Sequence, residues 1–235
     1  MIAVLGRECL EYFKTMLGYV FIATFLFLSG IFFVVGNIMP LDSDFNTTLN
    51  NCVYVFMMTS PLLTMRLLSE ERKTKRDQLL LTSSLSLVSI VMGKFLSALC
   101  VFAVACTLSF VYPAILIIFG TPSIPLILNG YTGFFLIGAS FIAVGIFASA
   151  LTENQLAAAG GTYGFLLLFL TLDHMIARVK IGRFAEVLRW FSLFRRFTPY
   201  QFGSFSLSST IYYMLFSALF VTFSVIAMDC RRRAS

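Results

Sequence analysis

Long stretches without a charged residue dominate the pattern of the chain. The five longest are bounded by these pairs: Lys14 and Asp42, Asp44 and Arg66, Lys94 and Glu153, Glu153 and Asp173, Arg196 and Asp229. A helix needs about 20 apolar residues to cross a bilayer core about 30 Å thick. The longest stretch therefore holds two crossings and each of the others holds one. The pattern predicts an all-α membrane protein whose six transmembrane helices lie at about 17–37, 49–68, 95–119, 127–151, 156–173 and 208–229.

Residues 2–16 show a different pattern, in which apolar residues recur at helical spacing along one side. Arg7, Glu11 and Lys14 fall on the other side. Such an amphipathic helix can lie in the headgroup plane before the first span. The alternative is that these residues are only the start of that span.

Composition strengthens the membrane assignment. Of the 235 residues, 59% are hydrophobic and 12% are charged. Soluble domains average about 45–50% apolar and about 25% charged residues, so a soluble enzyme and a disordered chain are both excluded. Six spans with short connections leave no room for a second large domain, and we expect one transmembrane domain over residues 1–235.

Charge placement predicts the orientation. An even number of spans puts both termini on one side, and with that side cytoplasmic most of the basic residues lie inside. The inside set is Arg7, Lys14, Arg66, Arg72, Lys73, Lys75, Arg76, Lys94, Arg231, Arg232 and Arg233. Segment 174–207 is the exception, because it carries six further bases and is placed outside. We expect it to lie on the outer leaflet as an interfacial segment, and the alternative is that one predicted span is wrong.

Candidate chemistry is sparse. The chain has no P-loop to bind ATP and no zinc-protease motif, and its single His174 with five dispersed cysteines makes no metal cluster. The spans hold essentially no ionisable residue, which disfavours an ion-coupled transporter and places the energy source in another chain. Weak candidates for a substrate pathway are Thr24, Asn50, Asn51, Thr59 and Ser60. Gly160 and Gly164 form a G-x-x-x-G pair that we expect to pack helices together.

The stretch from Arg66 to Leu96 combines acids, bases and an amphipathic run just beyond a span. Such a charged segment can dock a soluble partner, and it can equally be a solvated loop that satisfies the positive-inside rule. Composition and spacing do not separate the two.

The order of residues in this stretch resembles the coupling region of ABC transporter permeases of the type-2 exporter family. The matching residues are Glu70, Glu71 and Arg72, then Asp77, Gln78, Leu79, Leu80, Leu81, Thr82 and Ser83, then Leu85 and Ser86, then the run Ile90 to Leu96. Ser84 stands where that family usually has proline. The turn from Ser149 to Gln155 resembles the gliding-motility-type branch of the family.

The resemblance implies a permease subunit of an ATP-driven exporter in the cytoplasmic membrane of a bacterium. Two permeases, identical or different, would pair over two separate ATP-binding subunits, which would carry ATP and Mg²⁺. Segment 69–93 would contain a cytoplasmic coupling helix, and segment 174–207 would be external. The competing hypothesis is a membrane anchor or scaffold in an envelope or motility complex, without transport of its own.

Overall fold

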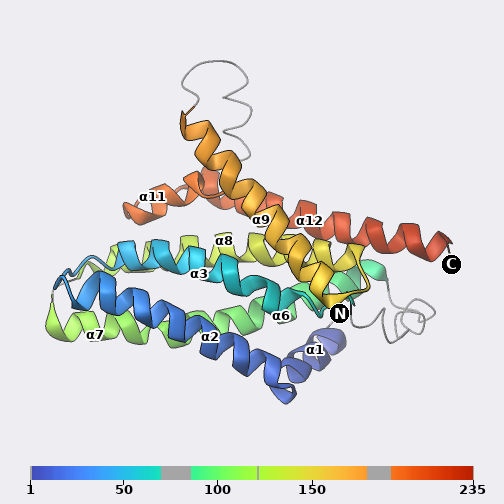
Figure 1. Cartoon of the computed structure of the whole chain (residues 1–235), viewed down its shortest axis with the longest axis horizontal. Coiled ribbons are helices and arrows are strands. Elements are labelled where there is room, and N and C mark those ends of the chain that lie inside the picture. The colour runs from blue at the N-terminus through green and yellow to red at the C-terminus, as the bar shows by residue number, and fades with distance from the viewer. Residues whose placement is uncertain (1, 70–85, 121, 179–191, 235) are drawn as a thin grey trace.

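The computed structural model describes residues 2–69, 86–120, 122–178 and 192–234, and every regular element in these ranges is helical. Figure 1 shows the arrangement. The longer helices are α1 (Ile2–Lys14), α2 (Met16–Phe33), α3 (Phe45–Thr64), α6 (Leu87–Ser109), α7 (Val111–Phe119), α8 (Ile124–Leu151), α9 (Gln155–Arg178) and α12 (Leu207–Ala234). A π-helical turn η1 (Val34–Ile38) extends α2, and the short helices η2 (Arg195–Phe197) and α11 (Thr198–Gln201) precede α12.

Five of the six predicted spans correspond to helices long and apolar enough to cross a membrane. Within the described residues these are Met16–Ile38, Leu87–Ile118, Ile124–Leu151, Gln155–Met175 and Leu207–Cys230. The predicted span 49–68 falls on α3, which is 20 residues long but is not one of the five. Its first two turns hold polar residues, including Asn46, Asn50 and Asn51. A sixth crossing at α3 therefore stays a prediction.

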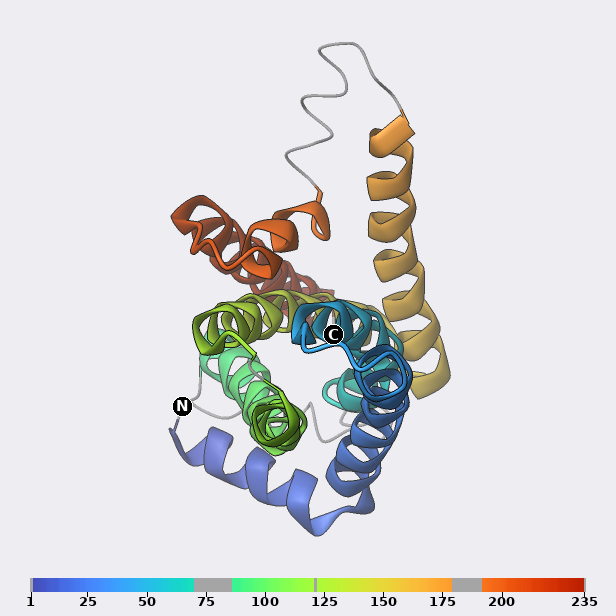
Figure 2. The ribbon, with the colours of Figure 1, turned by 90° about the vertical axis from the view of Figure 1, so that its left-hand side faces the viewer.

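Helix α8 forms the centre of the bundle. Within its apolar window 78% of the residues are buried, against 17% for α9, which leans away from the bundle toward its C-terminal end (Figure 2). Helices α3, α6, α9 and α12 all pack against α8. The side chain of Ser217 on α12 lies 3.3 Å from that of Ser140 on α8.

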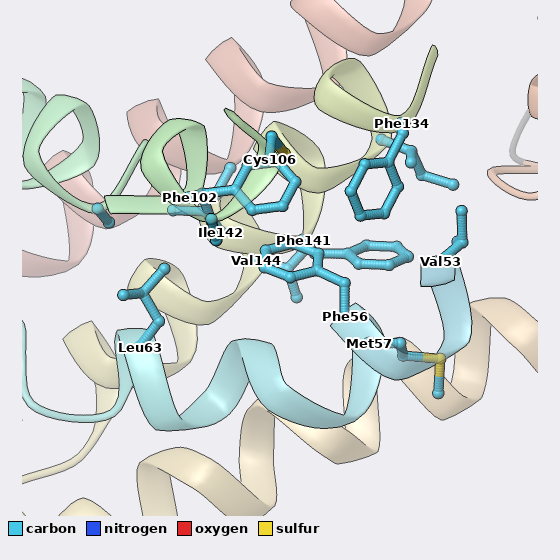
Figure 3. Packing of buried hydrophobic residues seen from close by; sticks show 14 of the residues in the cluster. Val53, Phe56, Met57, Leu63, Phe102, Cys106, Phe134, Phe141, Ile142 and Val144 are labelled. Atoms are coloured by element: carbon cyan, nitrogen blue, oxygen red, sulfur yellow. The ribbon is translucent and has the colours of Figure 1, made fainter. Parts of the chain in front are cut away.

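An aromatic layer fills the space between α8 and its neighbours. The ring centroid of Phe56 on α3 lies 4.0 Å from that of Phe102 on α6 and 6.1 Å from that of Phe141 on α8. Figure 3 shows these rings together with Phe134. The helices approach closely because α8 carries glycine at the contact: a Cβ at Gly138 would lie 2.4 Å from the Phe102 ring.

Two prolines interrupt backbone hydrogen bonding, and hydroxyl groups compensate. Pro113 has no N–H to donate to the carbonyl of Ser109, and the helix breaks there into α6 and α7. The Tyr131 hydroxyl donates to that carbonyl at 3.1 Å. Pro61 likewise has no N–H to donate to the carbonyl of Met57. That carbonyl accepts a hydrogen bond from the Ser60 hydroxyl at 3.2 Å instead. Satisfied carbonyls of this kind are required inside a bilayer, where no water replaces the missing donor.

Both termini lie at the same end of the bundle (Figure 1). Helix α1 is a separate helix, because Thr15 adopts an extended conformation before α2 begins. The chain turns back so tightly that a Cβ at Gly18 would lie 2.7 Å from the Tyr12 carbonyl oxygen. The predicted amphipathic helix over 2–16 is thus present as α1 over Ile2–Lys14.

One predicted span and the helix that contains it begin two turns apart. The third span was expected to begin at about residue 95, after Lys94, but α6 begins at Leu87. Lys94 therefore lies inside an apolar helix, where it is 2% exposed. A charge marks the end of a span only when it reaches water, and Lys94 does not.

Replacing Phe56 by alanine should destabilise the bundle by about 3 kcal/mol, the lower end of the range for a buried Phe. The lower end applies because lipid is as apolar as the core, so the loss comes from packing rather than from transfer out of water. Unfolding of the purified protein in detergent measures the difference. Phe27, which is 69% exposed, is the matched control. An equal loss in Phe27→Ala would contradict the assignment of Phe56 to the packing centre.

Candidate functional site

Most of the predicted coupling residues lie outside the described residues. These are Glu70, Glu71, Arg72, Leu80, Leu81, Thr82, Ser83, Ser84 and Leu85. Ser86 is described: it is exposed, and its hydroxyl accepts a hydrogen bond from the Ser89 amide at 3.3 Å to cap α6. What the structure describes of this region is its two ends, where the chain leaves the bundle at residue 69 and re-enters it at residue 86.

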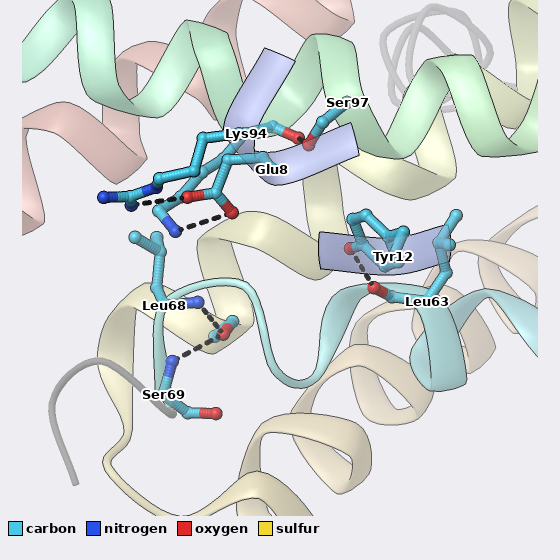
Figure 4. A network of polar contacts seen from close by, with 9 residues as sticks. Glu8, Tyr12, Leu63, Leu68, Ser69, Lys94 and Ser97 are labelled. Carbon is cyan, nitrogen blue, oxygen red and sulfur yellow. Dashed lines mark hydrogen bonds and ion pairs between the residues drawn. The ribbon is translucent and has the colours of Figure 1, made fainter. Parts of the chain in front are cut away.

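The chain leaves the bundle at Ser69, which is held by the end of α8. The Ser149 hydroxyl oxygen accepts hydrogen bonds from the amides of Leu68 and Ser69, each at 3.1 Å (Figure 4). The same hydroxyl donates to the carbonyl of Met65 at 3.3 Å. Ser69 and Ser149 are both fully buried. One side chain thus fixes the last described turn before residue 70.

The chain re-enters the bundle on α6, which is tied to α1 by a buried ion pair. Lys94 Nζ lies 3.2 Å from Glu8 Oε2, and the two side chains are 2% and 7% exposed. The other carboxylate oxygen of Glu8 accepts from Arg7 at 3.0 Å (Figure 4). Buried charges are expensive unless they are paired, and this pairing lets Lys94 lie two turns inside α6.

Tyr12 joins α1 to the end of α3. Its hydroxyl donates to the carbonyl of Leu63 at 2.7 Å (Figure 4). Burial, reinforced by the charge of Glu8, raises the pKa of this hydroxyl well above its ordinary value. Tyr12 therefore stays protonated and remains a donor. With the ion pair, it makes α1 a brace between the two helices that flank segment 70–85.

We call these contacts the anchor site: Ser149 with Leu68 and Ser69, Glu8 with Lys94, and Tyr12 with Leu63. It contains no nucleophile activated by a neighbouring base. Within the described ranges, no group of three or more His, Cys, Asp or Glu is placed to hold a metal ion. What the arrangement can do is mechanical, because a displacement of residues 69 or 86 would be passed to α3, α6, α8 and α1 together.

The predicted pathway residues are not brought together at one cavity. Thr59 and Ser60 are buried and donate to carbonyls of their own helix, Thr59 to Val55 at 3.1 Å. Thr24 and Asn51 are half-buried and line neither of the described clefts. Asn50 lines a cleft at the opposite end of the bundle from the anchor site. A continuous pathway through these residues stays a prediction.

Gly160 and Gly164 make no close helix contact with the described residues of the chain, so their expected role in helix packing stays a prediction. Both are exposed on α9, and a Cβ at either position would meet nothing within 4 Å. Glycines of α8 make such close contacts with other helices instead. A Cβ at Gly145 would lie 2.2 Å from Thr64 Oγ1, and one at Gly133 would lie 2.6 Å from the Tyr200 ring.

The anchor site itself was missed by sequence reasoning. Glu8 and Lys94 are 86 residues apart, so no local pattern pairs them. The available signal was weak: a lysine placed where the apolar run begins, and an acid on a helix expected to lie nearby. Ser149 stands out in the sequence only as the first residue of the turn from Ser149 to Gln155.

Comparison with known proteins adds no relative: a scan against protein-family models and a search of curated proteins both find no match to the chain. The resemblance to permeases thus rests on the residues quoted above.

The Glu8–Lys94 pair should show strong coupling in a double-mutant cycle. With Glu8→Gln and Lys94→Met, we expect the two losses of stability to be non-additive by about 1–3 kcal/mol, because both residues are buried and in contact. Chemical unfolding of the four proteins in detergent gives the coupling. Glu11 and Lys14 are exposed on the same helix, and Glu11→Gln with Lys14→Met is the control cycle, expected to couple by at most about 0.5 kcal/mol. Equal coupling in the two cycles would show that the buried pair is not special.

Ser149→Ala should release the end of α3. The change leaves the amides of Leu68 and Ser69 without their acceptor, which costs about 1–3 kcal/mol when the groups stay buried. Hydrogen exchange at these two amides should become much faster, whereas exchange at Phe56, in the middle of α3, should change little. Mass-spectrometric exchange on the purified protein distinguishes the two regions. Unchanged protection at residues 68 and 69 would refute the role given to Ser149.

Proposed function

We propose that this chain is a permease subunit of an ATP-driven ABC exporter, working with separate ATP-binding subunits. The observation that carries the proposal is that the chain is fixed by buried polar contacts on both sides of segment 70–85, at Ser69 directly before it and at Lys94, two turns into α6, after it. A solvated loop needs no such fixation. A segment that must pass a force from a soluble partner to the helices does need it.

The force from the partner subunit would reach the helices through the contacts of the anchor site. A partner subunit closing on ATP and Mg²⁺ would push the segment that carries Glu70, Glu71 and Arg72. Ser149 would pass the displacement at residue 69 to α8, and the Glu8–Lys94 pair would pass the displacement of α6 to α1. The chain needs no nucleotide site of its own for this role, and its sequence has no P-loop.

The orientation follows from charge. The anchor site and both termini lie at the same end of the bundle (Figure 1). Most lysines and arginines belong to the N-terminal helix, to the stretch 66–94 or to the C-terminus, which all adjoin that end. By the positive-inside rule this end is cytoplasmic, in the inner membrane of a bacterium. We propose that α3 is the sixth crossing, screened from lipid by α2, α8 and α9.

The other end of the bundle would face outward. Described residues 192–206 pack there, with Leu193, Phe197 and Tyr200 all buried. Arg196 lies 4.1 Å above the ring centre of Tyr212, whose aromatic face stabilises its charge. The basic segment would be external because the charge pattern places the anchor-site end of the bundle in the cytoplasm. The exposed glycines of α9 leave room for a helix of a second permease.

The acids of segment 70–85 provide the test. Glu70→Ala with Glu71→Ala should weaken engagement of the ATP-binding subunit about tenfold, because two charged contacts are lost. ATP hydrolysis by the co-purified complex should fall toward that of the soluble subunit alone. Glu11→Ala removes an exposed acid from α1 and is the control, expected to leave both measurements unchanged.

Two results would refute the proposal. One is that no ATP-binding subunit co-purifies with the wild-type chain. The other is a complex whose ATP hydrolysis is unaffected by the double substitution. Stable co-purification with envelope proteins that hydrolyse no ATP would favour the anchor or scaffold function instead.

A further inference from the structure

A cleft whose lining residues are mostly polar lies at the end of the bundle opposite the anchor site. Its volume is about 350 Å³, and it is lined by the start of α3, the start of α8 and the turn after α11. An adjoining cleft of about 240 Å³ shares Asp44, Asn46 and Leu126 with it. The larger cleft falls in the size range of small-molecule sites.

The walls of this cleft are held in place by buried amides. The Asn46 side chain, 6% exposed, donates to the carbonyl of Gln201 at 2.7 Å. Asn129 on α8 donates to the carbonyl of Gly203 at 2.8 Å, and Gly203 has a φ of 73°, which glycine adopts without strain. On the other side, Asn37 donates to the carbonyls of Asp42 and Asp44. The three lining segments are therefore positioned by contacts that a ligand would not disturb.

Several lining groups keep free hydrogen-bonding capacity. Asp44 uses Oδ1 to cap α3 at the Asn46 amide, 3.0 Å away, and no described group bonds to its Oδ2. The side chains of Thr47, Asn50 and Gln201 make no hydrogen bond to any described residue. Together they offer a carboxylate acceptor, two amides that donate and accept, and a hydroxyl.

The balance of these groups selects the ligand class. No lysine or arginine lines the cleft, which disfavours phosphate and other anions. An amine would satisfy Asp44 but has no acceptor for the amide and hydroxyl donors. Hydroxyl groups both donate and accept, so vicinal hydroxyls match the mixture. Phe202, 79% exposed at the rim, offers an apolar face to the C–H side of a ring.

We infer that this cleft binds a neutral polyhydroxylated ligand, a sugar unit, at the end of the bundle away from the anchor site. Asp44, Asn50 and Gln201 hydrogen-bond its hydroxyls, and Phe202 packs against its ring. The inference stands independently of the proposed function, since it concerns binding by the isolated chain.

Binding to the chain in nanodiscs of phospholipid without glycolipid tests the inference. Maltoside detergents carry a sugar headgroup and are kept out. The probes are glucose, galactose, mannose and N-acetylglucosamine, with choline as the amine arm and methyl phosphate as the anion arm. Binding of each probe is measured by saturation-transfer NMR of its carbon-bound protons. At least one sugar should bind saturably, with a dissociation constant on the order of 1 mM, and neither choline nor methyl phosphate should.

Three variants localise the site. Asn50→Ala and Gln201→Ala should each weaken sugar binding about tenfold, and neither removes a described hydrogen bond within the fold. Asp44→Asn removes the charge but keeps a good helix cap, and should also weaken binding. Asp42→Asn is the matched control in the same loop, outside the cleft lining, and should leave binding unchanged.

Absence of saturable sugar binding overturns the inference, as does sugar binding that all three variants leave intact. Choline binding that Asp44→Asn abolishes identifies an amine site instead. None of these results bears on the exporter proposal, because no ATP-binding subunit is present in the experiment.

Discussion

Close approach of helices to α8 is the constraint on which the structure depends. In lipid the hydrophobic effect does not hold helices together, because the acyl chains are as apolar as the core. Stability then comes from dispersion and from the fit of one helix surface against another. Gly138 and Gly145 allow this fit: the first admits the Phe102 ring and the second admits Thr64, both at distances that any side chain at these positions would block. The aromatic rings around Phe56 can pack against α8 only because Gly138 has no side chain at that contact.

Several hydroxyl groups in this bundle satisfy backbone carbonyls. Ser60 and Tyr131 supply donors to carbonyls that Pro61 and Pro113 leave open. Thr59 bonds within its own helix. In a bilayer such donors are needed wherever a helix breaks. A serine or threonine in a span is thus weak evidence for a substrate path, which explains why the predicted candidates do not converge.

The sequence predicted the existence and order of the helices well, for a simple physical reason. Charged residues are excluded from apolar spans, so the charge gaps locate the helices and bilayer thickness sets their lengths. The predicted span 127–151 corresponds to α8 at Ile124–Leu151, within three residues. The same rule starts the third span after Lys94, two turns beyond the start of α6, and Lys94 can lie inside that helix because it is paired with Glu8 across 86 residues. Long-range partners leave no trace in local composition. Gly160 and Gly164 show a related limit: a small-residue motif indicates that a helix can approach, without saying which helix does.

Helix α3 connects the two polar regions of the molecule. At one end Asn46, its second residue, holds the turn after α11. At the other end the carbonyl of Leu63 takes the Tyr12 hydroxyl, and the residues that follow are held by Ser149. Between these ends α3 packs along α8 with fully buried side chains such as Phe56 and Thr64. Packed interiors transmit displacements because they are dense and compress little. Under the proposed function, a push at residue 69 is therefore delivered along α3 and α8 as a pair. The polar residues Asn46, Thr47 and Asn50 make the start of α3 less apolar than an ordinary span. The same residues line the cleft.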